Sequence, residues 1–493
     1  MSILSLLILI PLIGAIIIYL SSDYLSKSKS KYVSILKVAE MIVVLNFILS
    51  LILWIQFDSN TAQFQFVEDW GSLFESGLCH FIIGVDGISL FLVILTTFLT
   101  IPILLTPPYK GKSPLSYIII ILLLESLLIA VFVVLDLLLF YICFESVLIP
   151  MFLMIVIWGA REKKIHAAYQ FFLYTLLGSL FMLLGILVIY YQTGTTDYQY
   201  LLSLAIDNKI VFARENLLWL TFFLSFAVKV PMFPFHLWLI HAHVEAPTGG
   251  SMLLAGILLK LGGYGFIRYA LTIFPNASLY FSPFVIALSL IGIIYSSLAC
   301  LRQIDIKSII AYSSIAHMNV SLLGIFSNEI QGLEGAVFLM ISHGIVSSAL
   351  FYSIGIIYNR THTRILKYYR GLATTMPLFS LFFFILSLSN MAVPGTSGFI
   401  GEFLVFIGIF KVNILATLIA SLSIILGAGY TVWLTNRLLF GTLSKYFEVY
   451  NDLTRSEFFI LLPLVFLSIL LGLFPNIILD NIHFSLSWIY LCL

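Results

Sequence analysis

The sequence is poor in charged residues. Asp, Glu, Lys and Arg make up only 10% of its 493 residues, against roughly a quarter in soluble domains. Hydrophobic residues make up 61%, more than a folded chain can hide from water. These proportions exclude a soluble enzyme and indicate that lipid is the main solvent. The net charge of +1 also lacks the basic excess that is typical of nucleic-acid-binding proteins, so no nucleic acid is expected as a partner.

Cysteine is equally scarce, and no two cysteines form a CxxC pair. The four are Cys79, Cys143, Cys300 and Cys492. This spacing argues against a disulfide framework, an iron–sulfur cluster, a haem attachment or a structural zinc site. A glycine-rich stretch at residues 262–265 lies inside an apolar run, where close helix packing explains it better than a nucleotide site. We therefore expect neither a cofactor nor a metal in this chain.

Long apolar runs are abundant. A spanning helix needs about 20 mostly apolar residues, and fourteen runs are long enough. Because backbone in hydrocarbon must satisfy its own hydrogen bonds, and because the runs are too long for barrel strands, the predicted fold is an all-α polytopic membrane bundle. The runs cover residues 2–20, 38–57, 87–106, 116–135, 137–158, 167–192, 216–239, 249–272, 280–300, 306–326, 334–358, 376–394 continuing through 399–411, 413–440 and 457–475.

The basic residues are distributed unevenly between the connections that join these runs. Numbered from the N-terminus, the odd connections hold 18 of the 24 Lys and Arg residues, and the even connections with their flanks hold 4. By the positive-inside rule, the odd connections face the matrix or cytoplasm and both termini face the opposite side. The odd set is Lys27, Lys29, Lys31, Lys37, Lys110, Lys112, Arg161, Lys163, Lys164, Arg302, Lys307, Arg360, Arg364, Lys367, Arg370, Arg437, Lys445 and Arg455, and the even set is Lys209, Arg214, Arg268 and Lys411.

The first apolar run begins almost at the first residue, at Ile3. The sequence shows neither an Arg-rich amphipathic transit segment nor a cleavable signal with a small-residue site. We therefore expect a chain that is bacterial or is made inside the organelle that uses it.

Five ionisable residues lie near the middle of apolar runs, where each costs at least about 2.5–3.5 kcal/mol on insertion scales. They are Glu125, Glu145, Lys229, Lys260 and Glu402. For any one of them, a structural ion pair or a side chain that snorkels to the interface is the alternative explanation. Five together favour a polar path through the membrane.

Histidines extend this path. His236, His241 and His243 surround the seventh run, His317 lies in the tenth and His343 in the eleventh. Imidazole titrates near neutrality and both donates and accepts protons, which suits a relay. A single buried histidine is explained as well by one hydrogen bond, so the weight of these five comes from their accompanying the lysines.

Two runs are interrupted by residues that break helices. The seventh contains Pro231 and Pro234 beside Lys229, and the twelfth contains residues 390–401 beside Glu402. Broken helices at corresponding positions of two halves mark the central site of transporters that are built from inverted repeats. Kinks that serve only packing are the alternative.

The runs divide the chain into four predicted parts. Residues 1–115 hold helices one to three, and residues 441–493 hold helix fourteen and a tail. Residues 116–275 and 276–440 hold five spans each, and because five is odd, the second of these repeats is inverted relative to the first.

Glu145 and Lys229 indicate how such a path could move protons. At an effective dielectric near 20, a carboxylate about 4 Å from a lysine contributes about 4 kcal/mol in favour of the charged lysine. Movement of Glu145 towards or away from Lys229 would therefore switch the lysine between holding and releasing its proton.

Several motifs together resemble one known family. They cover nearly the whole chain and are similar to the antiporter-like, proton-pumping membrane subunits of respiratory complex I, most closely to the mitochondrial branch called NADH dehydrogenase subunit 4. The segments are Tyr169–Thr175, Phe226–Pro231, Ala242–Thr248, Leu258–Gly262, Arg302–Asp305, Ile310–Met318, Pro394–Thr396 and Gly401–Phe403.

The resemblance implies a membrane-arm subunit of NADH:ubiquinone oxidoreductase that translocates protons, coupled to remote quinone reduction, without a redox centre of its own. It implies that Glu145 and Lys229 form a coupling ion pair, that Lys260 is the central relay and that Glu402 is the terminal exit residue. His236, His317 and His343 match positions that link the lysines or reach the surface, and Glu125 is a further candidate by its position alone.

The resemblance also implies the surroundings of the chain. NADH, FMN, iron–sulfur clusters and ubiquinone are expected in partner subunits. Other membrane-arm and accessory subunits are expected as neighbours, as are membrane lipids, cardiolipin among them. The expected location is the mitochondrial inner membrane, with a bacterial plasma membrane as the alternative. At Ile240 and His241 the family usually carries Pro and Glu, so the resemblance leaves the route of proton uptake near His241 open.

Two other functions remain open at this level. One is a cation/proton antiporter subunit of the multi-subunit bacterial type, which would require sodium or potassium. The other is a passive scaffold that only positions its neighbours.

Overall fold

The computed structural model describes residues 3–25, 29–72, 79–106, 113–206, 215–444, 446 and 450–492. Among the basic residues used to predict orientation, six lie outside the described residues: Lys27, Lys110, Lys112, Lys209, Arg214 and Lys445.

Helices make up most of the described chain. The elements in order are α1 (Ile3–Leu25), α2 (Lys29–Gln56), β1 (Gln65–Ser72), β2 (His80–Val85), α3 (Gly87–Leu105), α4 (Pro114–Val133), α5 (Leu137–Ser146), α6 (Leu148–Trp158), α7 (Lys164–Thr193), α8 (Tyr198–Ile206), α9 (Glu215–Lys229), α10 (Leu237–Glu245), α11 (Thr248–Leu253), η1 (Leu254–Leu258), α12 (Leu259–Gly265), η2 (Phe266–Ala270), α13 (Leu271–Ile273), α14 (Pro275–Arg302), α15 (Ile306–Ile325), α16 (Ile330–Thr361), η3 (Leu366–Tyr368), α17 (Leu372–Thr375), α18 (Pro377–Asn390), α19 (Ser397–Val412), α20 (Ile414–Leu439), α21 (Arg455–Leu473) and α22 (Asn476–Cys492).

Within the described residues, 12 helices are long and apolar enough to cross a membrane. The seventh and twelfth predicted runs fall on helices in two pieces. α9 ends at Lys229 and α10 begins at Leu237, whereas α18 ends at Asn390 and α19 begins at Ser397. The predicted class, a polytopic helical membrane protein, is confirmed, and the count of fourteen spans stays a prediction.

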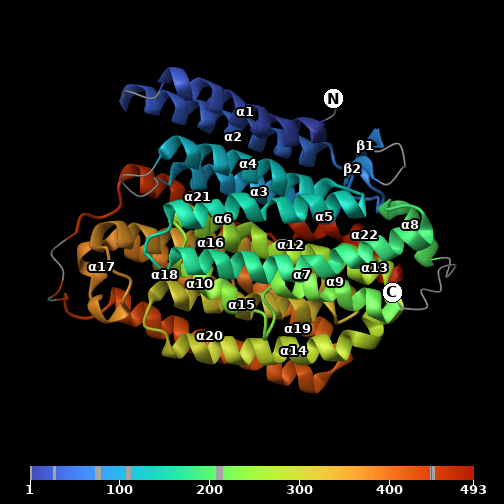
Figure 1. The fold of residues 1–493 in the computed structure, drawn as a ribbon. Helices are drawn as coiled ribbons and strands as arrows, with labels where there is room; N and C mark the ends of the chain where they lie inside the picture. The colour runs from blue at the N-terminus through green and yellow to red at the C-terminus, as the bar shows by residue number, and fades with distance from the viewer. Residues whose placement is uncertain are drawn as a thin grey trace.

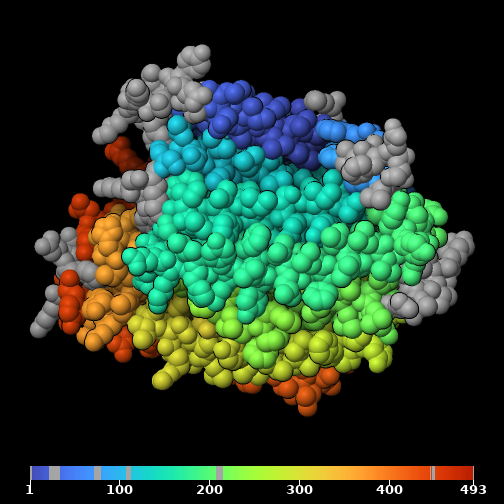
Figure 2. All heavy atoms as spheres, viewed as in Figure 1, coloured from blue at the N-terminus to red at the C-terminus, as the bar shows by residue number. Residues whose placement is uncertain are grey.

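The helices run side by side in one bundle (Figure 1). α1 and α2 form one edge, and α14 and α20 lie at the opposite edge. The green-coloured residues that include α7 and α9 cover the middle of the face in Figure 2. Both termini lie at the same end of the bundle and α17 lies at the other end (Figure 1), as an even number of crossings requires.

Two membrane-length segments form the centre of the bundle. The most apolar stretches of Thr248–Ile273 and Ile330–Thr361 are 100% buried inside the chain, whereas those of Ser34–Gln56 and Ile414–Leu439 are only 28% buried. The two central segments are thus separated from lipid by other helices. Polar side chains on them can find partners in the protein, which hydrocarbon cannot supply.

A two-stranded antiparallel sheet of β1 and β2 is an addition to the predicted all-α architecture. The carboxylate of Asp136, which caps α5, accepts hydrogen bonds from the amide of His80 (3.2 Å) and from the hydroxyl of Thr196 (2.7 Å). These bonds fasten the sheet to the end of the bundle that carries the termini. The sheet was missed because its residues lie between two apolar runs, where bilayer thickness imposes no pattern on the sequence.

The Cys79 thiol at the start of β2 provides a test of this end of the bundle. Burial, and secondarily the Asp136 carboxylate, raise the pKa of Cys79 to about 12. The raised pKa keeps the thiol protonated at neutral pH, and only the thiolate is a good nucleophile. In a variant that retains Cys79 alone, we expect maleimide to react at pH 8 roughly 50-fold more slowly than with free cysteine, and faster as pH rises. A rate equal to that of free cysteine at pH 8 would contradict the buried environment.

Candidate functional site

Four of the predicted residues lie in one line through the buried centre. Lys260 of α12 places its Nζ 2.9 Å from Nδ1 of His343 on α16, and Nδ1 of His317 on α15 lies 2.9 Å from Oε1 of Glu402 on α19. The His317 and His343 rings are 5.8 Å apart between centroids. Lys260, His343 and Glu402 are buried and His317 is nearly so. Two charged ends and two imidazoles thus form a nearly continuous polar path between four helices.

Glycines let helices at the centre of the bundle approach each other closely. A side-chain carbon at Gly262 would lie 2.9 Å from the carbonyl oxygen of Phe226 on α9, and one at Gly344 would lie 2.9 Å from the carbonyl oxygen of Gly256 in η1. η1 is a π-helical turn that ends two residues before Lys260, and the Lys260 ammonium also donates to the Ala255 carbonyl within it. π-helical turns are frequent at functional sites because they displace the side chains that follow.

Glu145 and Lys229 lie near each other without an ion pair. Lys229 is buried at the last position of α9, and its Nζ lies 4.5 Å from the ring centroid of Phe144 on α5. Glu145 is the next residue along α5 and is half-buried. Neither its carboxylate oxygens nor the Lys229 Nζ has a hydrogen-bond partner among the described residues. The aromatic face therefore stabilises the ammonium where a carboxylate was predicted.

His236 lies in the break between α9 and α10 and is separate from the line. Its buried ring stacks on Phe233 with centroids 5.7 Å apart and meets the edge of Tyr295 at 5.3 Å. Neither ring nitrogen has a hydrogen-bond partner among the described residues. The structure thus holds His236 between aromatic rings beside the break after Lys229.

Glu125 is buried on α4 and pairs with a residue that the sequence analysis missed. The Asn46 side-chain amide on α2 donates to Glu125 Oε1 at 2.7 Å. Asn46 is the only asparagine inside the second apolar run. This isolated polar residue was the feature of the sequence that could have indicated a buried partner. The contact fits a local structural role, because within the described part of the chain no hydrogen bond or ion pair joins Glu125 to the line of Lys260 and Glu402.

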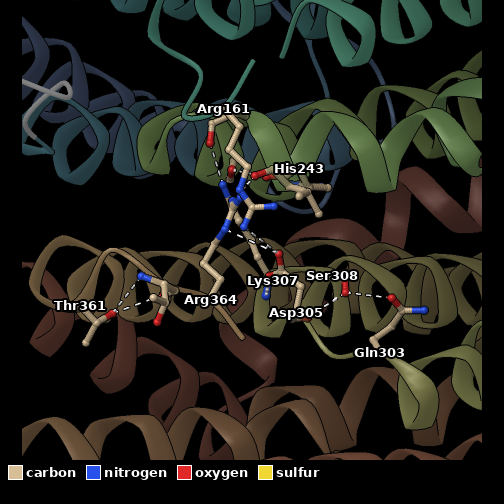
Figure 3. Close-up of polar contacts among 12 residues, drawn as sticks. Arg161, His243, Gln303, Asp305, Lys307, Ser308, Thr361 and Arg364 are labelled. Atoms are coloured by element: carbon tan, nitrogen blue, oxygen red, sulfur yellow. Dashed lines mark hydrogen bonds and ion pairs between the residues drawn. The ribbon is translucent and has the colours of Figure 1, made fainter. Parts of the chain in front are cut away.

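Of the two histidines on α10, His241 is exposed and His243 is buried. The His243 ring lies parallel to Phe351 of α16, with centroids 4.5 Å apart and an interplanar angle of 5°. Figure 3 shows this ring beside a cluster of charged residues at the end of α10.

Donors at this cluster bind the carbonyl groups of the last two residues of α10 and of Ala246, the residue that follows the helix. The guanidinium of Arg364 donates to the carbonyl of Val244, the amide of Ala160 donates to that of Glu245 at 3.1 Å, and the Lys307 ammonium donates to that of Ala246 at 2.7 Å. The donors come from three different odd connections. Positive groups at the C-terminal end of a helix are favoured by its dipole and satisfy its free carbonyls.

Asp305 links the same cluster together (Figure 3). One carboxylate oxygen lies 3.8 Å from Arg161 and 3.6 Å from Arg364. Lys307 and Arg364 were assigned to connections from sequence, and the structure buries both side chains. This burial could not be predicted from the sequence, because a basic residue beside an apolar run is usually solvated at the membrane surface.

A second buried ion pair lies towards the opposite end of the bundle. Arg268 of η2 lies 2.6 Å from Asp86, which also caps α3. The guanidinium is surrounded by aromatic rings, and its Nε donates to the Tyr264 hydroxyl at 3.2 Å. Arg268 was likewise assigned to the flank of a connection, whereas its side chain is buried.

Comparison with known proteins decides the family. A family model described as "NADH:quinone oxidoreductase/Mrp antiporter, TM" matches residues 134–427. The chain belongs to this family. The predicted resemblance is confirmed.

Curated members of the antiporter family extend the match to nearly the whole chain. The chain is 53% identical over 483 residues to NADH-ubiquinone oxidoreductase chain 4 of Marchantia polymorpha, covering 98% of this chain and 95% of the relative. It is 53% identical over 484 residues to the protein of the same name from Arabidopsis thaliana, with the same coverage, and 49% identical over 486 residues to that from Mycosarcoma maydis, covering 98% of each.

Solved structures of the family agree with the observed fold. The chain matches a subunit in respiratory complex I from Thermus thermophilus with bound NADH, with a TM-score of 0.88, 27% identity and coverage of 100% and 99% of the two chains. It matches a chain of the Mrp complex from Dietzia sp. DQ12-45-1b with a TM-score of 0.86, 20% identity and coverage of 99% and 98%. At that lower identity the likeness shows the fold alone.

The charged cluster at the end of α10 yields a stability prediction for this family member. Lys307→Met keeps the aliphatic stem but leaves the Ala246 carbonyl without its donor, which costs about 1–3 kcal/mol for a buried group. We expect the temperature at which the purified assembly loses activity to fall by a few degrees. Lys163→Met, at an exposed position of the neighbouring connection, is the control. Equal behaviour of the two variants would show that Lys307 does not support the end of α10.

Proposed function

We propose that the chain is a proton-translocating membrane-arm subunit of an NADH:ubiquinone oxidoreductase. The observation that carries the proposal is the buried line Lys260, His343, His317 and Glu402, with two contacts of 2.9 Å. Family membership supports it, since the curated relatives bear the name NADH-ubiquinone oxidoreductase chain 4. The chain would contribute to the enzyme by moving protons, while NADH, FMN, iron–sulfur clusters and ubiquinone bind to other subunits.

Along the line, each group can pass a proton to the next. The Lys260 ammonium donates its proton to His343 Nδ1, and His343 then releases one from Nε2, which has no partner among the described residues. Because the ring centroids are 5.8 Å apart, the step to His317 requires a ring rotation or a bridging water. His317 finally delivers a proton from Nδ1 to the Glu402 carboxylate. Glu402 is the proposed exit residue.

Glu145 and Lys229 form the proposed coupling element at the other side of the centre. The Lys229 ammonium is now held by the Phe144 ring, and Glu145 is the adjacent residue. A small movement of α5 or α9 would exchange the aromatic contact for a carboxylate contact and change the affinity of Lys229 for its proton. His236, beside the break that follows Lys229, is the proposed supporting group here.

The positions of the two helix breaks support two repeats arranged around this centre. The break after α9 lies in residues 116–275 and the break after α18 lies in residues 276–440. Each repeat thus supplies one lysine or glutamate of the path beside its own break, as expected for inverted repeats. Residues 1–115 and 441–493 would be additional helices at the periphery, and the proposed location is the mitochondrial inner membrane.

Cation/proton antiport is a second candidate, favoured by the description of the matching family model, which names both NADH:quinone oxidoreductase and Mrp antiporter. The two functions differ in their need for a metal cation. NADH-driven proton translocation that persists in sodium- and potassium-free buffer supports the complex I function. Translocation that disappears without these ions supports antiport.

The Lys229→Ala and Glu402→Gln variants test the relay directly. Removal of a proton-transfer group commonly lowers the rate of the transfer step about 100-fold or more. We therefore expect NADH-driven proton translocation in reconstituted vesicles to be largely lost while the assembly remains intact. Lys163→Ala and Glu162→Gln, at exposed positions, are matched controls. Wild-type translocation in both relay variants would favour a passive scaffold.

Glu145→Gln tests the coupling element separately. Loss of the carboxylate charge should lower NADH:quinone reductase activity, because quinone reduction is coupled to proton movement. Electron transfer from NADH to an artificial acceptor does not depend on this coupling and should stay unchanged. An equal loss of both activities would indicate misassembly and would count against a coupling role for Glu145.

A further inference from the structure

A cavity of about 820 Å³ lies at the end of the bundle that carries the termini, and we call it the terminal cavity. Exposed residues line it, among them Thr61 and Gln63 before β1 and Gln199 of α8, so the cavity is open to water. The paired residues Arg268 and Asp86 line it as well, although neither side chain is more than 4% exposed. The inner wall of the cavity therefore carries a buried ion pair.

Arg268 belongs to the same central segment as Lys260, the buried lysine of the proposed proton path. Both lie on Thr248–Ile273, separated by about two helical turns, or about 12 Å. By the predicted orientation, the end with the termini faces away from the matrix or cytoplasm, so protons are released on its side. A continuous water-filled path from the terminal cavity to Lys260 would let released protons flow back. The residues between the cavity and Lys260 therefore decide whether a proton pump could hold a gradient.

Between Arg268 and Lys260, the hydrogen bonds end at a backbone carbonyl. The Nε of Arg268 donates to the Tyr264 hydroxyl at 3.2 Å, and Tyr264 donates its own proton to the Phe132 carbonyl at 3.1 Å. A carbonyl oxygen accepts a hydrogen bond but has no proton to pass on. Within the described chain, neither Tyr264 nor Arg268 has a hydrogen bond to Lys260. A chain of proton donors from the terminal cavity thus stops before it reaches Lys260.

Aromatic rings enclose the Arg268 guanidinium and keep water away from it. Their centroids lie 4.9, 5.7 and 5.3 Å from its Cζ atom, and the rings are those of Phe64, Tyr198 and Tyr264. The Tyr198 hydroxyl also leads to a carbonyl, because it donates to Thr272 at 3.1 Å and Thr272 donates to the backbone carbonyl of Arg268. The Arg268 side chain is consequently only 3% exposed, although a wide cavity lies beside it.

The guanidinium also opposes proton entry by its charge. An arginine does not give up its proton in proteins, so it cannot pass one on. Its Nη2 lies 2.6 Å from Oδ1 of Asp86 while its Nε contacts Tyr264, which places the cation between the carboxylate and the tyrosine. A proton that reached Asp86 from the terminal cavity would next meet a fixed positive charge. Arginine side chains exclude protons from water-conducting pores in the same way.

We propose that the Arg268–Asp86 pair is a proton barrier that separates the terminal cavity from Lys260, so that protons leave the central line on the side of Glu402. The proposal rests on the proposed function, because it takes Lys260 as a carrier of protons. An outlet through the terminal cavity is the opposite possibility. It would require Tyr264 to leave the Phe132 carbonyl and a proton to pass the guanidinium, whereas the contact of Glu402 with the central line is already formed at 2.9 Å.

Passive proton influx into sealed vesicles tests the barrier. The purified assembly is reconstituted with a trapped pH-sensitive dye, and a potassium diffusion potential drives influx without NADH. Arg268→Gln/Asp86→Asn removes both charges, makes room for water at a polar position and keeps a good capping residue for α3. Because fixed charges change local ion concentrations about 10-fold or more, we expect influx per assembly to rise about tenfold or more. During NADH oxidation, the same leak should lower the steady pH gradient.

Two further variants show whether the leak passes through Lys260. Arg360→Gln/Glu457→Gln removes an ion pair of 2.7 Å near the opposite end of the bundle and should keep wild-type influx. Addition of Lys260→Met to the barrier variant should return influx to the wild-type rate. A leak that persists without Lys260 would overturn the claim that the pair protects this lysine.

Arg268→Lys guards against failed assembly, which electron transfer from NADH to an artificial acceptor monitors. It keeps a cation beside Asp86 but introduces a group that can release its proton, so we expect a smaller rise in influx. Wild-type influx and a wild-type gradient in both Arg268 variants would overturn the barrier. Slower initial translocation with unchanged influx would indicate an outlet through the terminal cavity instead. Failure of the proposed function would differ from both, since Lys229→Ala and Glu402→Gln would then translocate protons as the wild type does.

Discussion

The structure depends on one constraint: a charged or polar group in hydrocarbon needs a partner from the protein itself. Lys260, His343 and Glu402 satisfy it because the segments that carry them are enclosed by other helices. α20, whose one charged residue, Arg437, lies in its last turn, is left to face the surroundings. The arrangement of the bundle, with polar helices at the centre and apolar ones outside, follows from this requirement, since an uncompensated charge costs several kcal/mol.

The features that bilayer thickness determines could be predicted from the sequence, whereas few features of the connections outside the bilayer could. The apolar runs, their interruption after Lys229 and before Glu402, and the ionisable residues within them could be found because hydrocarbon fixes the length and polarity of a span. The pairing of Lys260 with His343 could not, because the two residues are 83 positions apart and only the packing of whole helices brings them together. The β1–β2 sheet and the burial of Lys307 were missed because they depend on connections outside the bilayer pattern.

The contact between Lys229 and Phe144 shows why residue identity alone did not specify the site. A lysine and a glutamate on neighbouring helices predict an ion pair, yet a shift of one residue along α5 offers an aromatic face instead. Both contacts stabilise an ammonium, and the difference between them is a few kcal/mol at most. Local sequence patterns do not resolve a difference of this size.

The cluster at the end of α10 joins distant parts of the chain. Ala160 and Arg161 precede the middle of the sequence, whereas Asp305, Lys307 and Arg364 follow it, and all of them meet at one helix end. The other end of α10 opens into the break that holds His236. At that end the Trp238 indole donates to the carbonyl of Val228, the residue before Lys229, at 3.0 Å. α10, nine residues long, is thus bonded at both ends and joins the charged cluster to the residue beside Lys229.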